Sequence, residues 1–329
     1  MKIFVTGGAG FIGSHLVERL LYAGHQVDIL DNFSDYYDPE IKRDNIRQSL
    51  REPDFRLFEG DIRDRNYLAG IFNANKYDLV IHLAAMAGVR LSIEQPLLYN
   101  EVNIGGTWNL LEECRKHEIQ KFIFSSSSSV YGDNSHLPFN EEDSVDHPIS
   151  PYAASKKSGE LICHTYHHIF DISVLCLRFF TVYGARQRPD LAIHKFARMM
   201  SKGVPLKLYG DGSSARDYTY IDDIISGVMG AIDYIRHHKC YEIINLGESE
   251  TISLLDMVKI LAEEMGIKAD YETVSMQPGD VQITYADIRK ARKMLGYEPK
   301  TEFQAGIRKF IKWFNEQQNI KLYRATEER

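Results

Sequence analysis

The chain has 329 residues, which is long for a single compact core and sufficient for two domains. A hydrophobic fraction of 44% and a charged fraction of 26% are typical of a globular protein. The formal net charge is −7 and the basic residues are dispersed, so the composition argues against a nucleic-acid-binding face and a nucleic-acid partner.

The N-terminal segment predicts a strand–helix–strand unit. Residues 2–6 (KIFVT) form a short apolar run, and a glycine-rich turn follows it. Residues 11–23 carry apolar side chains four positions apart, which indicates a helix that ends at Gly24. Residues 26–30 (QVDIL) form a second apolar run. We therefore expect two buried strands joined by a helix.

The alternation of strands and helices continues through the first half of the chain. Continuous apolar runs at 78–85, 121–127 and 172–180 predict strands of a sheet that is covered on both faces. Helices are predicted between them, near 103–117 and 151–169. This pattern predicts an α/β fold with a doubly wound parallel sheet.

The pattern changes after about residue 181, where the segments become shorter and richer in turns. Further helices are predicted at 222–236, 253–265 and 303–317. The segment 219–247 (TYIDDI to INLG) is expected to return to the sheet, which makes the domains discontinuous.

The predicted domain organisation follows from these segments. The first domain takes residues 1–180 and 219–248, and a second, smaller α/β domain takes residues 181–218 and 249–329. The ligand of the second domain is expected to be the substrate.

The cysteines, the histidines and the lengths of the apolar runs bear on redox state, metal binding and location. Four widely spaced cysteines without a CxxC pair indicate reduced thiols in a cytoplasmic protein. His164, His167 and His168 lie on one predicted helix without acidic or cysteine partners at ligand spacing, so no metal is expected. The N-terminus lacks the pattern of a secretory signal, and no run reaches the roughly 18 apolar residues of a membrane span. We expect a cytoplasmic protein without a membrane partner.

A glycine motif lies in the turn between the first strand and the first helix. Gly7 allows the tight turn, Gly10 lets the backbone approach a pyrophosphate, and Gly13 lets the helix pack on the strand. The phosphates then lie at a helix N-terminus, where free N–H groups and the helix dipole favour anions. Such a motif alone is common, but its strand–turn–helix context predicts a dinucleotide-binding (Rossmann) domain.

Two acidic residues refine the prediction of the cofactor. Asp31 ends the second strand, roughly 20 residues after the glycines, where a carboxylate binds the ribose hydroxyls and repels a 2′-phosphate. NAD is therefore predicted rather than NADP. The alternative for Asp31 is a turn residue at a strand end. Asp61 and Ile62 follow a third predicted strand and could reach the adenine, although Asp61 is nearly as well explained as a turn aspartate.

A second motif, SPYAASK, spans residues 150–156. Ser150 is a good N-cap and Pro151 suits the first helical position, so Tyr152 and Lys156 lie one helical turn apart on the same face. A neighbouring ammonium and the positive nicotinamide ring lower the pKa of a phenol, which normally lies near ~10. Tyr152 can then remove a proton from an alcohol while hydride leaves for the cofactor. The alternative is an ordinary Tyr/Lys pair on a helix surface.

A run of serines, Ser125 to Ser129, ends the strand predicted at 121–127. The run continues an apolar strand and leads into Val130, which argues against a flexible linker. Hydroxyl groups at the C-terminal end of a parallel strand face the ligand crevice. One of them is expected to hold the reacting hydroxyl next to Tyr152.

These motifs together resemble the extended short-chain dehydrogenase/reductase family of nucleotide-sugar enzymes, over nearly the whole chain. The shared segments, besides the glycines, are HLAA (82–85), SSSSSVYG (125–132), SPYAASK (150–156) and RDYTYIDD (216–223). Other segments resemble the UDP-glucuronate 4-epimerases of that family in particular. They are NFSDYYDPEIKRDNI (32–46), AGVRLSIEQP (87–96), RFFTVYGARQRPD (178–190) and MQPGDVQITYADI (276–288).

The resemblance implies roles for individual residues. Ser127, Tyr152 and Lys156 match the family's catalytic residues. The sugar carboxylate is expected at Ser128, Ser129 and Thr181, and the UDP group at Arg188, Tyr209, Arg216 and Asp280. The cofactor site is expected to include Gly7, Gly10, Phe11, Ile12, Gly13, Asp31, Asn32, Asp61, Ile62, Leu83, Ala84, Ala85, Tyr152 and Lys156. Ala185 stands where relatives carry proline, and we expect a small local change there without loss of function.

The implied reaction inverts C4 of a UDP-sugar acid, UDP-glucuronate to UDP-galacturonate, without net redox change. Tyr152 removes the O4 proton, NAD takes hydride from C4, the 4-keto sugar turns about its pyrophosphate, and hydride returns to the other face. The cofactor should therefore remain bound. The 4-keto acid could lose CO2, and fixed hydroxyl donors on its carboxylate are expected to oppose this loss. Dimerisation is expected through the helices near 103–117 and 151–169, as in relatives.

Four alternatives remain open at this stage. UDP-glucuronate decarboxylases usually carry Glu at the position of Ser129, and 4,6-dehydratases carry an Asp-Glu pair at 128–129. UDP-glucose 4-epimerases usually carry Asn at Thr181 and Arg at Gln277. A non-catalytic NAD-sensing protein on the same fold would tend to lack the Tyr/Lys pair. These absences favour the epimerase of sugar acids.

Overall fold

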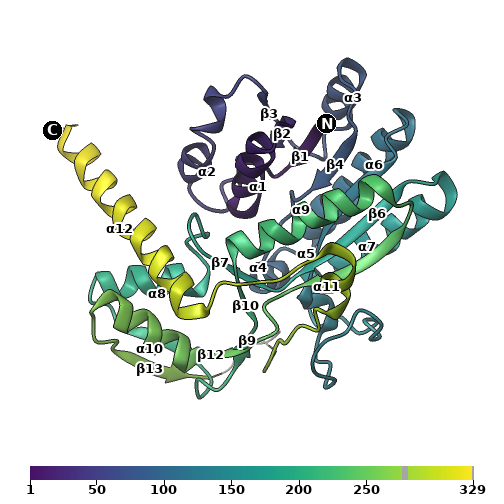
Figure 1. The fold of residues 1–329 in the computed structure, drawn as a ribbon. Coiled ribbons are helices and arrows are strands. Elements are labelled where there is room, and N and C mark those ends of the chain that lie inside the picture. The colour runs from purple at the N-terminus through teal and green to yellow at the C-terminus, as the bar shows by residue number, and fades with distance from the viewer. Residues whose placement is uncertain (276–280, 328–329) are drawn as a thin grey trace.

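The central sheet has seven strands, all parallel, in the order β11-β6-β5-β4-β1-β2-β3 (Figure 1). The computed structural model describes residues 1–275 and 281–327. The strands are β1 (Lys2–Thr6), β2 (Gln26–Asp31), β3 (Phe55–Glu59), β4 (Leu79–His82), β5 (Lys121–Ser127), β6 (Ser173–Phe179) and β11 (Tyr241–Leu246). The order reverses between β1 and β4, which confirms the doubly wound α/β fold predicted from the sequence.

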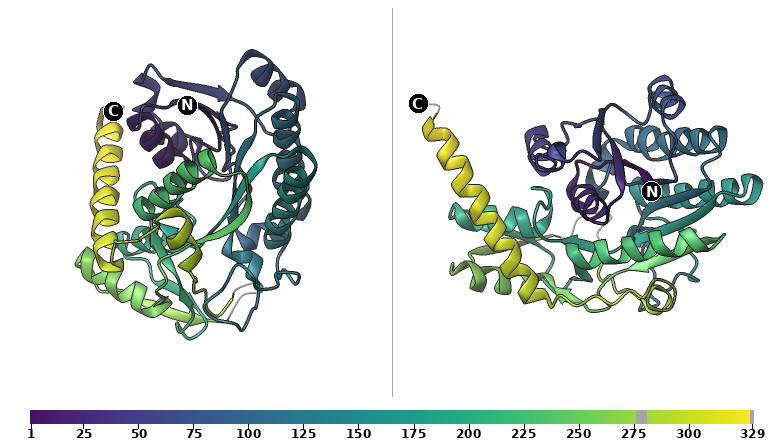
Figure 2. Two further views of the ribbon diagram at one scale, coloured as in Figure 1. Left: turned by 45° about the vertical axis from the view of Figure 1, so that its right-hand side comes forward. Right: turned by 45° about the horizontal axis from the view of Figure 1, so that its top comes forward.

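Helices cover both faces of this sheet (Figures 1 and 2). One face carries α1 (Phe11–Tyr22) and α9 (Ile221–His237), which pack against each other. The other carries α3 (Arg65–Ala74), α6 (Gly106–Lys116) and α7 (Pro151–Phe170). The inner strands β1, β2, β4, β5 and β6 are almost fully buried, because a sheet covered on both faces has no solvated side, whereas the edge strands β3 and β11 are more exposed.

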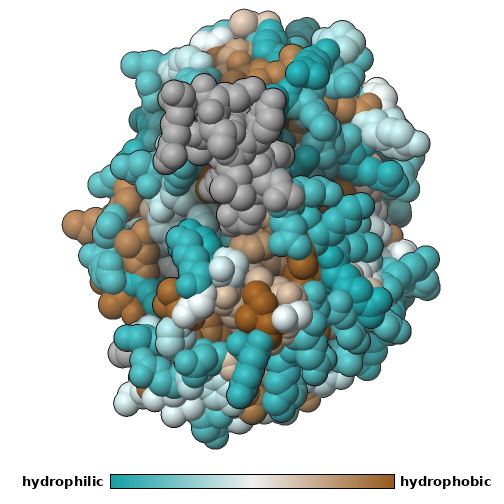
Figure 3. Space-filling model, turned by 90° about the vertical axis from the view of Figure 1, so that its left-hand side faces the viewer, coloured by the Kyte–Doolittle hydropathy of each residue, from teal (hydrophilic) through white to brown (hydrophobic). Residues whose placement is uncertain are grey.

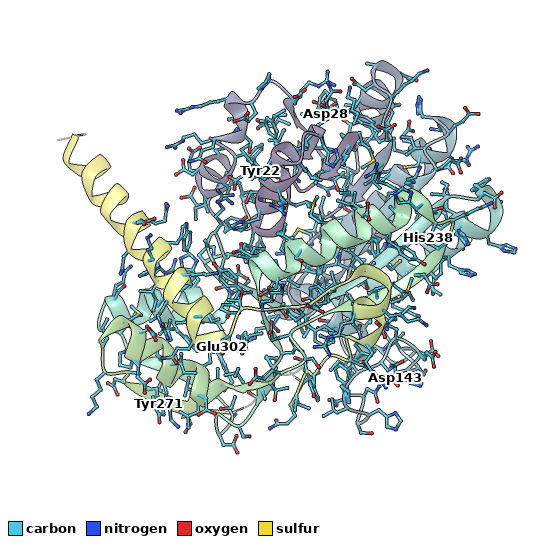
Figure 4. All side chains as sticks on the ribbon, in the orientation of Figure 1. Tyr22, Asp28, Asp143, His238, Tyr271 and Glu302 are labelled. Carbon is cyan, nitrogen blue, oxygen red and sulfur yellow. The ribbon has the colours of Figure 1, made fainter. Side chains whose placement is uncertain are left out.

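The second half of the chain adds pairs of short strands and further helices (Figure 1). The pairs are β7 (Thr181–Tyr183) with β10 (Tyr218–Tyr220), β8 (Leu206–Tyr209) with β13 (Tyr271–Val274), and β9 (Ala215–Arg216) with β12 (Ile252–Ser253). The helices are α8 (Ala192–Ser201), α10 (Leu254–Met265), α11 (Arg289–Leu295) and α12 (Phe303–Glu327). In Figure 4, Tyr271 of β13 and Asp28 of β2 mark the lower and upper parts of the molecule.

The chain crosses between these two parts several times. The segment 219–247 returns to the sheet as expected, because β11 pairs with β6. Helix α11 packs against α9 and β11, although its residues fall in the range predicted for the second domain. The division into two domains therefore stays a prediction.

Some element boundaries differ from the sequence prediction. The strand expected at 78–85 ends at His82, because the Leu83 and Ala84 amides turn to bond Thr6. A π-helical turn, η2 (Asn100–Gly105), precedes α6, and α12 is longer than the predicted 303–317.

Several helical elements of the described residues were not predicted. They are α3, α8 and α11, together with α2 (Pro39–Asn45), η1 (Ser49–Arg51), α4 (Val89–Glu94), α5 (Pro96–Tyr99), η2 and η3 (Ser128–Tyr131). On the face that Figure 3 shows, hydrophilic residues surround the hydrophobic ones. The described helices include none with the length and apolar character of a membrane-crossing segment.

Candidate active site

The turn between β1 and α1 requires glycine for reasons of space. Gly7 has φ +72°, and a Cβ there would lie 2.7 Å from the Ala84 amide nitrogen. A Cβ on Gly13 would lie 2.1 Å from the Gly7 carbonyl oxygen, whereas a Cβ on Gly10 would lie 3.3 Å from it. Gly10 is also the N-cap of α1 and forms no side-chain cap, so the first N–H groups of the helix remain available to an anion.

Gly10 and Gly13 allow a matched test of the predicted pyrophosphate site at this turn. Gly10→Ala should fold but weaken dinucleotide binding by about 1–3 kcal/mol, because the protein approaches this Cβ only at the Gly7 carbonyl oxygen, 3.3 Å away, and the remaining space is expected to hold the pyrophosphate. Gly13→Ala should disturb the turn itself and lower the thermal midpoint even without cofactor. Calorimetric titration with NAD and thermal unfolding of both variants separate the effects. Unchanged NAD affinity in Gly10→Ala would argue against a pyrophosphate at this turn.

Asp31 stands at the end of β2, as predicted, and has a second role. Its carboxylate accepts hydrogen bonds from the backbone N–H of Ala9, at 3.1 Å, and of Phe33, at 2.9 Å. Burial raises the pKa of Asp31, and the nearby charge of Lys42 opposes this rise. The side chain thus ties the glycine turn to the loop after β2, in addition to its proposed contact with the ribose.

The other predicted cofactor residues surround the same turn. Phe11 and Ile12 open α1, and Leu83 to Ala85 follow β4, where the Ala84 backbone lies against Gly7. The Asn32 amide donates to Asp61 at 2.9 Å, and Arg63 also binds Asp61. The pairing of Arg63 with Asp61 was not foreseen. Ile62 is buried beside Gly106 of α6.

His82 is explained by packing rather than by ligand chemistry. Its ring hydrogen-bonds the hydroxyls of Thr6, at 2.8 Å, and Thr107, at 3.0 Å. Burial lowers its pKa to about 3, with a smaller effect from the Lys156 charge, so the imidazole is neutral. The ring links β1 and β4 to α6.

The motif at residues 150–156 forms the start of α7 as predicted. The Ser150 hydroxyl accepts from the Ala153 amide at 3.1 Å, and Pro151 occupies the first turn. This cap fixes where the helix begins, and it therefore fixes the positions of Tyr152 and Lys156 one turn apart.

Lys156 of α7 is buried against the end of β5. Its ammonium donates to the Ser125 carbonyl at 2.7 Å, and burial lowers its pKa to about 7. Burial also raises the pKa of Tyr152, and the groups that oppose this rise are the hydrogen-bonded Ser127 hydroxyl and the positive charge of Arg188. The Lys156 ammonium thus bonds to the end of β5, and its expected effect on the Tyr152 phenolate stays a prediction.

The serine run lies where β5 ends. Ser127 is the N-cap of η3, and its hydroxyl accepts from the Ser129 amide at 3.2 Å. Ser128 and Ser129 form the first turn of η3, and Thr181 begins β7 directly after β6. The hydroxyl groups thus follow two neighbouring strands of the sheet at their C-terminal ends, which is the edge where ligands bind in such folds.

The residues predicted to hold UDP lie in the second half of the chain. Arg188 follows β7 and pairs with Asp190, and Arg216 in β9 donates to the Ala215 carbonyl at 2.9 Å. Tyr209 ends β8, and the guanidinium of Arg90 in α4 lies over its ring, 4.5 Å from the centroid. Asp280 lies outside the described residues.

Four residues near the site were missed at the sequence level: Tyr36, Arg90, Tyr99 and Asp190. The Tyr99 ring meets the Tyr152 ring edge to face, with 6.1 Å between centroids. Tyr36, Arg90 and Asp190 all lie within segments that carried the family resemblance, so that signal could have found them.

The fold and the site together define a class of protein. The glycine turn lies at the N-terminus of α1. Helix α7 carries Tyr152, which is half-buried, and the buried Lys156 one turn later, with the Ser127 hydroxyl next to the tyrosine. This is the arrangement of an extended short-chain dehydrogenase/reductase. The family model described as GDP-mannose 4,6 dehydratase matches residues 4–310, and the chain belongs to this family.

Several relatives have names that are more specific. A UDP-glucuronate 4-epimerase of Thermodesulfobacterium geofontis is 41% identical, with 98% of each chain covered. UDP-glucuronate 4-epimerase 3 of Arabidopsis thaliana is 43% identical over 95% of this chain and 76% of that protein. The crystal structure of UDP-glucuronic acid 4-epimerase from Bacillus cereus, in complex with UDP-glucuronic acid and NAD, is 38% identical, with a TM-score of 0.90 over 96% of this chain and all of that one (100%).

Proposed function

We propose that this protein is an NAD-dependent UDP-glucuronate 4-epimerase that interconverts UDP-glucuronate and UDP-galacturonate. The observation that carries the proposal is the placement of the Tyr152 phenol and the Ser127 hydroxyl next to each other, at the end of the sheet where Ser128, Ser129 and Thr181 also lie. Relatives named as UDP-glucuronate 4-epimerases match over nearly the whole of this chain, which supports the choice of substrate.

The residues present fit NAD. The space beside Gly10, the uncapped N-terminus of α1 and the acidic end of β2 suit a pyrophosphate and an unphosphorylated ribose. Gly7, Gly10, Gly13 and Asp31 would hold the cofactor, with Phe11, Ile12, Asn32, Asp61, Ile62 and residues 83–85 around them. When bound, NAD supplies reversible hydride acceptance at the sugar C4.

The side chains of the site handle protons and orientation. Ser127 holds the O4 hydroxyl of the sugar beside Tyr152, and the Tyr152 phenolate removes the O4 proton and later returns it. Arg188 favours the phenolate through its positive charge. Lys156 fixes the end of β5 through Ser125, which keeps Ser127 in place.

The hydroxyl groups of Ser128, Ser129 and Thr181 explain how a sugar acid can react at C4 without losing its carboxylate as CO2. Ser128, Ser129 and Thr181 offer hydroxyl groups to the sugar carboxylate, and position 129 lacks the glutamate usual in decarboxylases. We expect Thr181→Val and Ser128→Ala to raise the share of decarboxylated by-product, because a loosely held carboxylate can align for loss of CO2. Product analysis by NMR measures that share. An unchanged share in both variants would count against this role.

Further proposals concern assembly and location. Large apolar side chains are exposed on α6 and α7, among them Trp108 at 41%, Leu161 at 57% and Ile169 at 60%. A homodimer formed through these helices would cover them, and light scattering would test it. We also propose a cytoplasmic location, in keeping with the free cysteines.

The decisive experiment incubates the purified protein with UDP-glucuronate, without added NAD, and follows the products by proton NMR. UDP-galacturonate is expected, and its formation would also show that the cofactor is retained. UDP-xylose or a UDP-4-keto-pentose would indicate a decarboxylase. Turnover of UDP-glucose alone would indicate the neutral-sugar epimerase, and no turnover of any UDP-sugar after addition of NAD would favour a non-catalytic NAD-sensing protein.

A further inference from the structure

The segment between β7 and α8 is attached to the sheet half of the molecule at three points. The His15 ring of α1 hydrogen-bonds the Ala185 carbonyl at 2.9 Å. Arg186 pairs with Glu18 of α1 at 2.6 Å. The Tyr36 hydroxyl, from the loop after β2, donates to the Asp190 carboxylate at 3.2 Å. The third attachment differs from the others because Asp190 also binds Arg188.

Asp190 holds the Arg188 guanidinium with two hydrogen bonds. The Arg188 Nε donates to Oδ1 at 3.0 Å, and Nη2 donates to Oδ2 at 2.7 Å. The guanidinium also lies over the Tyr36 ring, 5.0 Å from its centroid. The carboxylate fixes the direction of the fork, and the aromatic ring supports its face. Tyr36 therefore acts on Arg188 both directly and through Asp190.

The Arg188 guanidinium approaches Tyr152 through Gly88 and Tyr99. A Cβ on Gly88 would lie 3.9 Å from both Arg188 Nη2 and the Tyr99 hydroxyl, so these two atoms border the same spot. The Tyr99 ring packs against the Tyr152 ring, and Arg188 is the charged group that acts on the Tyr152 phenol. Gly88 has φ +107°, which strains any other residue, and a Cβ there would lie 3.3 Å from the Tyr36 hydroxyl, a tight contact.

We propose that Asp190 and Tyr36 are positioning residues that hold the Arg188 guanidinium beside Tyr152, and that they act on catalysis through Arg188 alone. This inference deepens the proposed function and rests on it for the turnover measurements. It requires no contact of Asp190 or Tyr36 with substrate or cofactor. Their effect lies in where the positive charge of Arg188 is fixed.

The charges around Arg188 allow a test by pH. The ionisable groups that act on Arg188 or respond to it, apart from Tyr152, are Tyr36, Tyr37, Lys42, Tyr99 and Asp190. Burial raises the pKa of the three tyrosines, so they are neutral around pH 7. Loss of Asp190 then has two opposite consequences. If Arg188 moves away, the pKa of Tyr152 rises; if Arg188 stays and loses its counter-charge, the pKa of Tyr152 falls.

The experiment measures kcat, KM and the pH profile for Asp190→Ala, Tyr36→Phe and Arg188→Met. Asp190→Ala should lower kcat by about 10- to 100-fold, with a smaller change in KM, because a displaced charge no longer matches the reacting geometry. The acid limb of kcat/KM should move to higher pH in Asp190→Ala and Arg188→Met. Tyr36→Phe should move it in the same direction by less. Tyr37→Phe, which removes a hydroxyl from the neighbouring ring, is the matched control.

A double variant decides whether Asp190 acts through Arg188. In the Arg188→Met background, Asp190→Ala should cost nothing further in kcat. The same cost in both backgrounds, or a shift of the acid limb to lower pH, would overturn the proposal. Ultraviolet titration of the phenol, taken as the difference from Tyr152→Phe protein, reports the Tyr152 pKa without any substrate. This readout distinguishes failure of the positioning role from failure of the proposed reaction.

Discussion

Tyr152→Phe is expected to reduce kcat for epimerisation by about 10²- to 10⁴-fold, the usual contribution of a positioned acid–base group. The phenylalanine ring keeps the edge-to-face packing against Tyr99, so the fold and the affinity for UDP-sugar should change little. NMR of the product gives the rate, and the NAD content of the purified protein gives cofactor retention. The variant thus isolates the hydroxyl group.

The pH dependence of the native enzyme is a second test of Tyr152 as the proton acceptor. Burial raises the pKa of Tyr152 in the free protein, so the fraction of phenolate, and with it kcat/KM, should rise with pH on the acid limb. Ser127→Ala removes a hydrogen bond that opposes this rise and should move the limb to higher pH. A Tyr152→Phe variant that retained more than a tenth of the native kcat would exclude Tyr152 as the proton acceptor.

The parts of the site that sequence reasoning reached are those set by short-range geometry. The turn of Gly7 to Gly13 is local, and its requirement for glycine follows from backbone contacts within the turn and with the next strand. Tyr152 and Lys156 are one helical turn apart, so their common face follows from the helix period. The start of that helix was set by Ser150 and Pro151, which the sequence displays directly.

The parts that sequence reasoning missed depend on contacts between distant residues. The bond from Tyr36 to Asp190 joins positions separated by 154 residues. The π-helical turn before α6 coincides with Asn103, whose amide bonds both the N–H and the carbonyl of Met86, and no local pattern encodes that pairing. The direction of Lys156 depended on how closely β5 packs on α7, which periodicity does not report.

A buried ion pair supports the site from within the core. Arg178 of β6 and Glu160 of α7 are each 1% exposed, and they form two hydrogen bonds of 2.8 and 2.9 Å. The Ser126 hydroxyl donates to the same carboxylate at 2.6 Å, and Ser126 is the register partner of Arg178 on the neighbouring strand. Glu160 therefore ties β5 and β6 to α7, one turn after Lys156.

Arg178→Met is expected to destabilise the protein by about 3–5 kcal/mol, because it removes both charged hydrogen bonds to the buried Glu160 carboxylate and leaves only the Lys157 ammonium, 3.7 Å away, as counter-charge. Chemical denaturation gives the change in free energy of unfolding. The double variant Glu160→Met/Arg178→Met removes both charges and should recover most of that stability, since apolar replacement of a buried pair is often neutral or stabilising. A loss below about 1 kcal/mol for Arg178→Met alone would mean that Glu160 takes up a proton or finds another partner at small cost.

The double variant also separates stability from catalysis. Without the hydrogen bonds of Arg178 and Ser126 to Glu160, the ends of β5 and β6 can shift relative to α7. Ser127 is then less well aligned with Tyr152. We expect a stable protein with a kcat reduced by about tenfold or more, because small displacements in a reacting geometry carry large penalties. A native kcat in that variant would show that the apolar core alone places Ser127, and that the ion pair contributes to stability without positioning the catalytic groups.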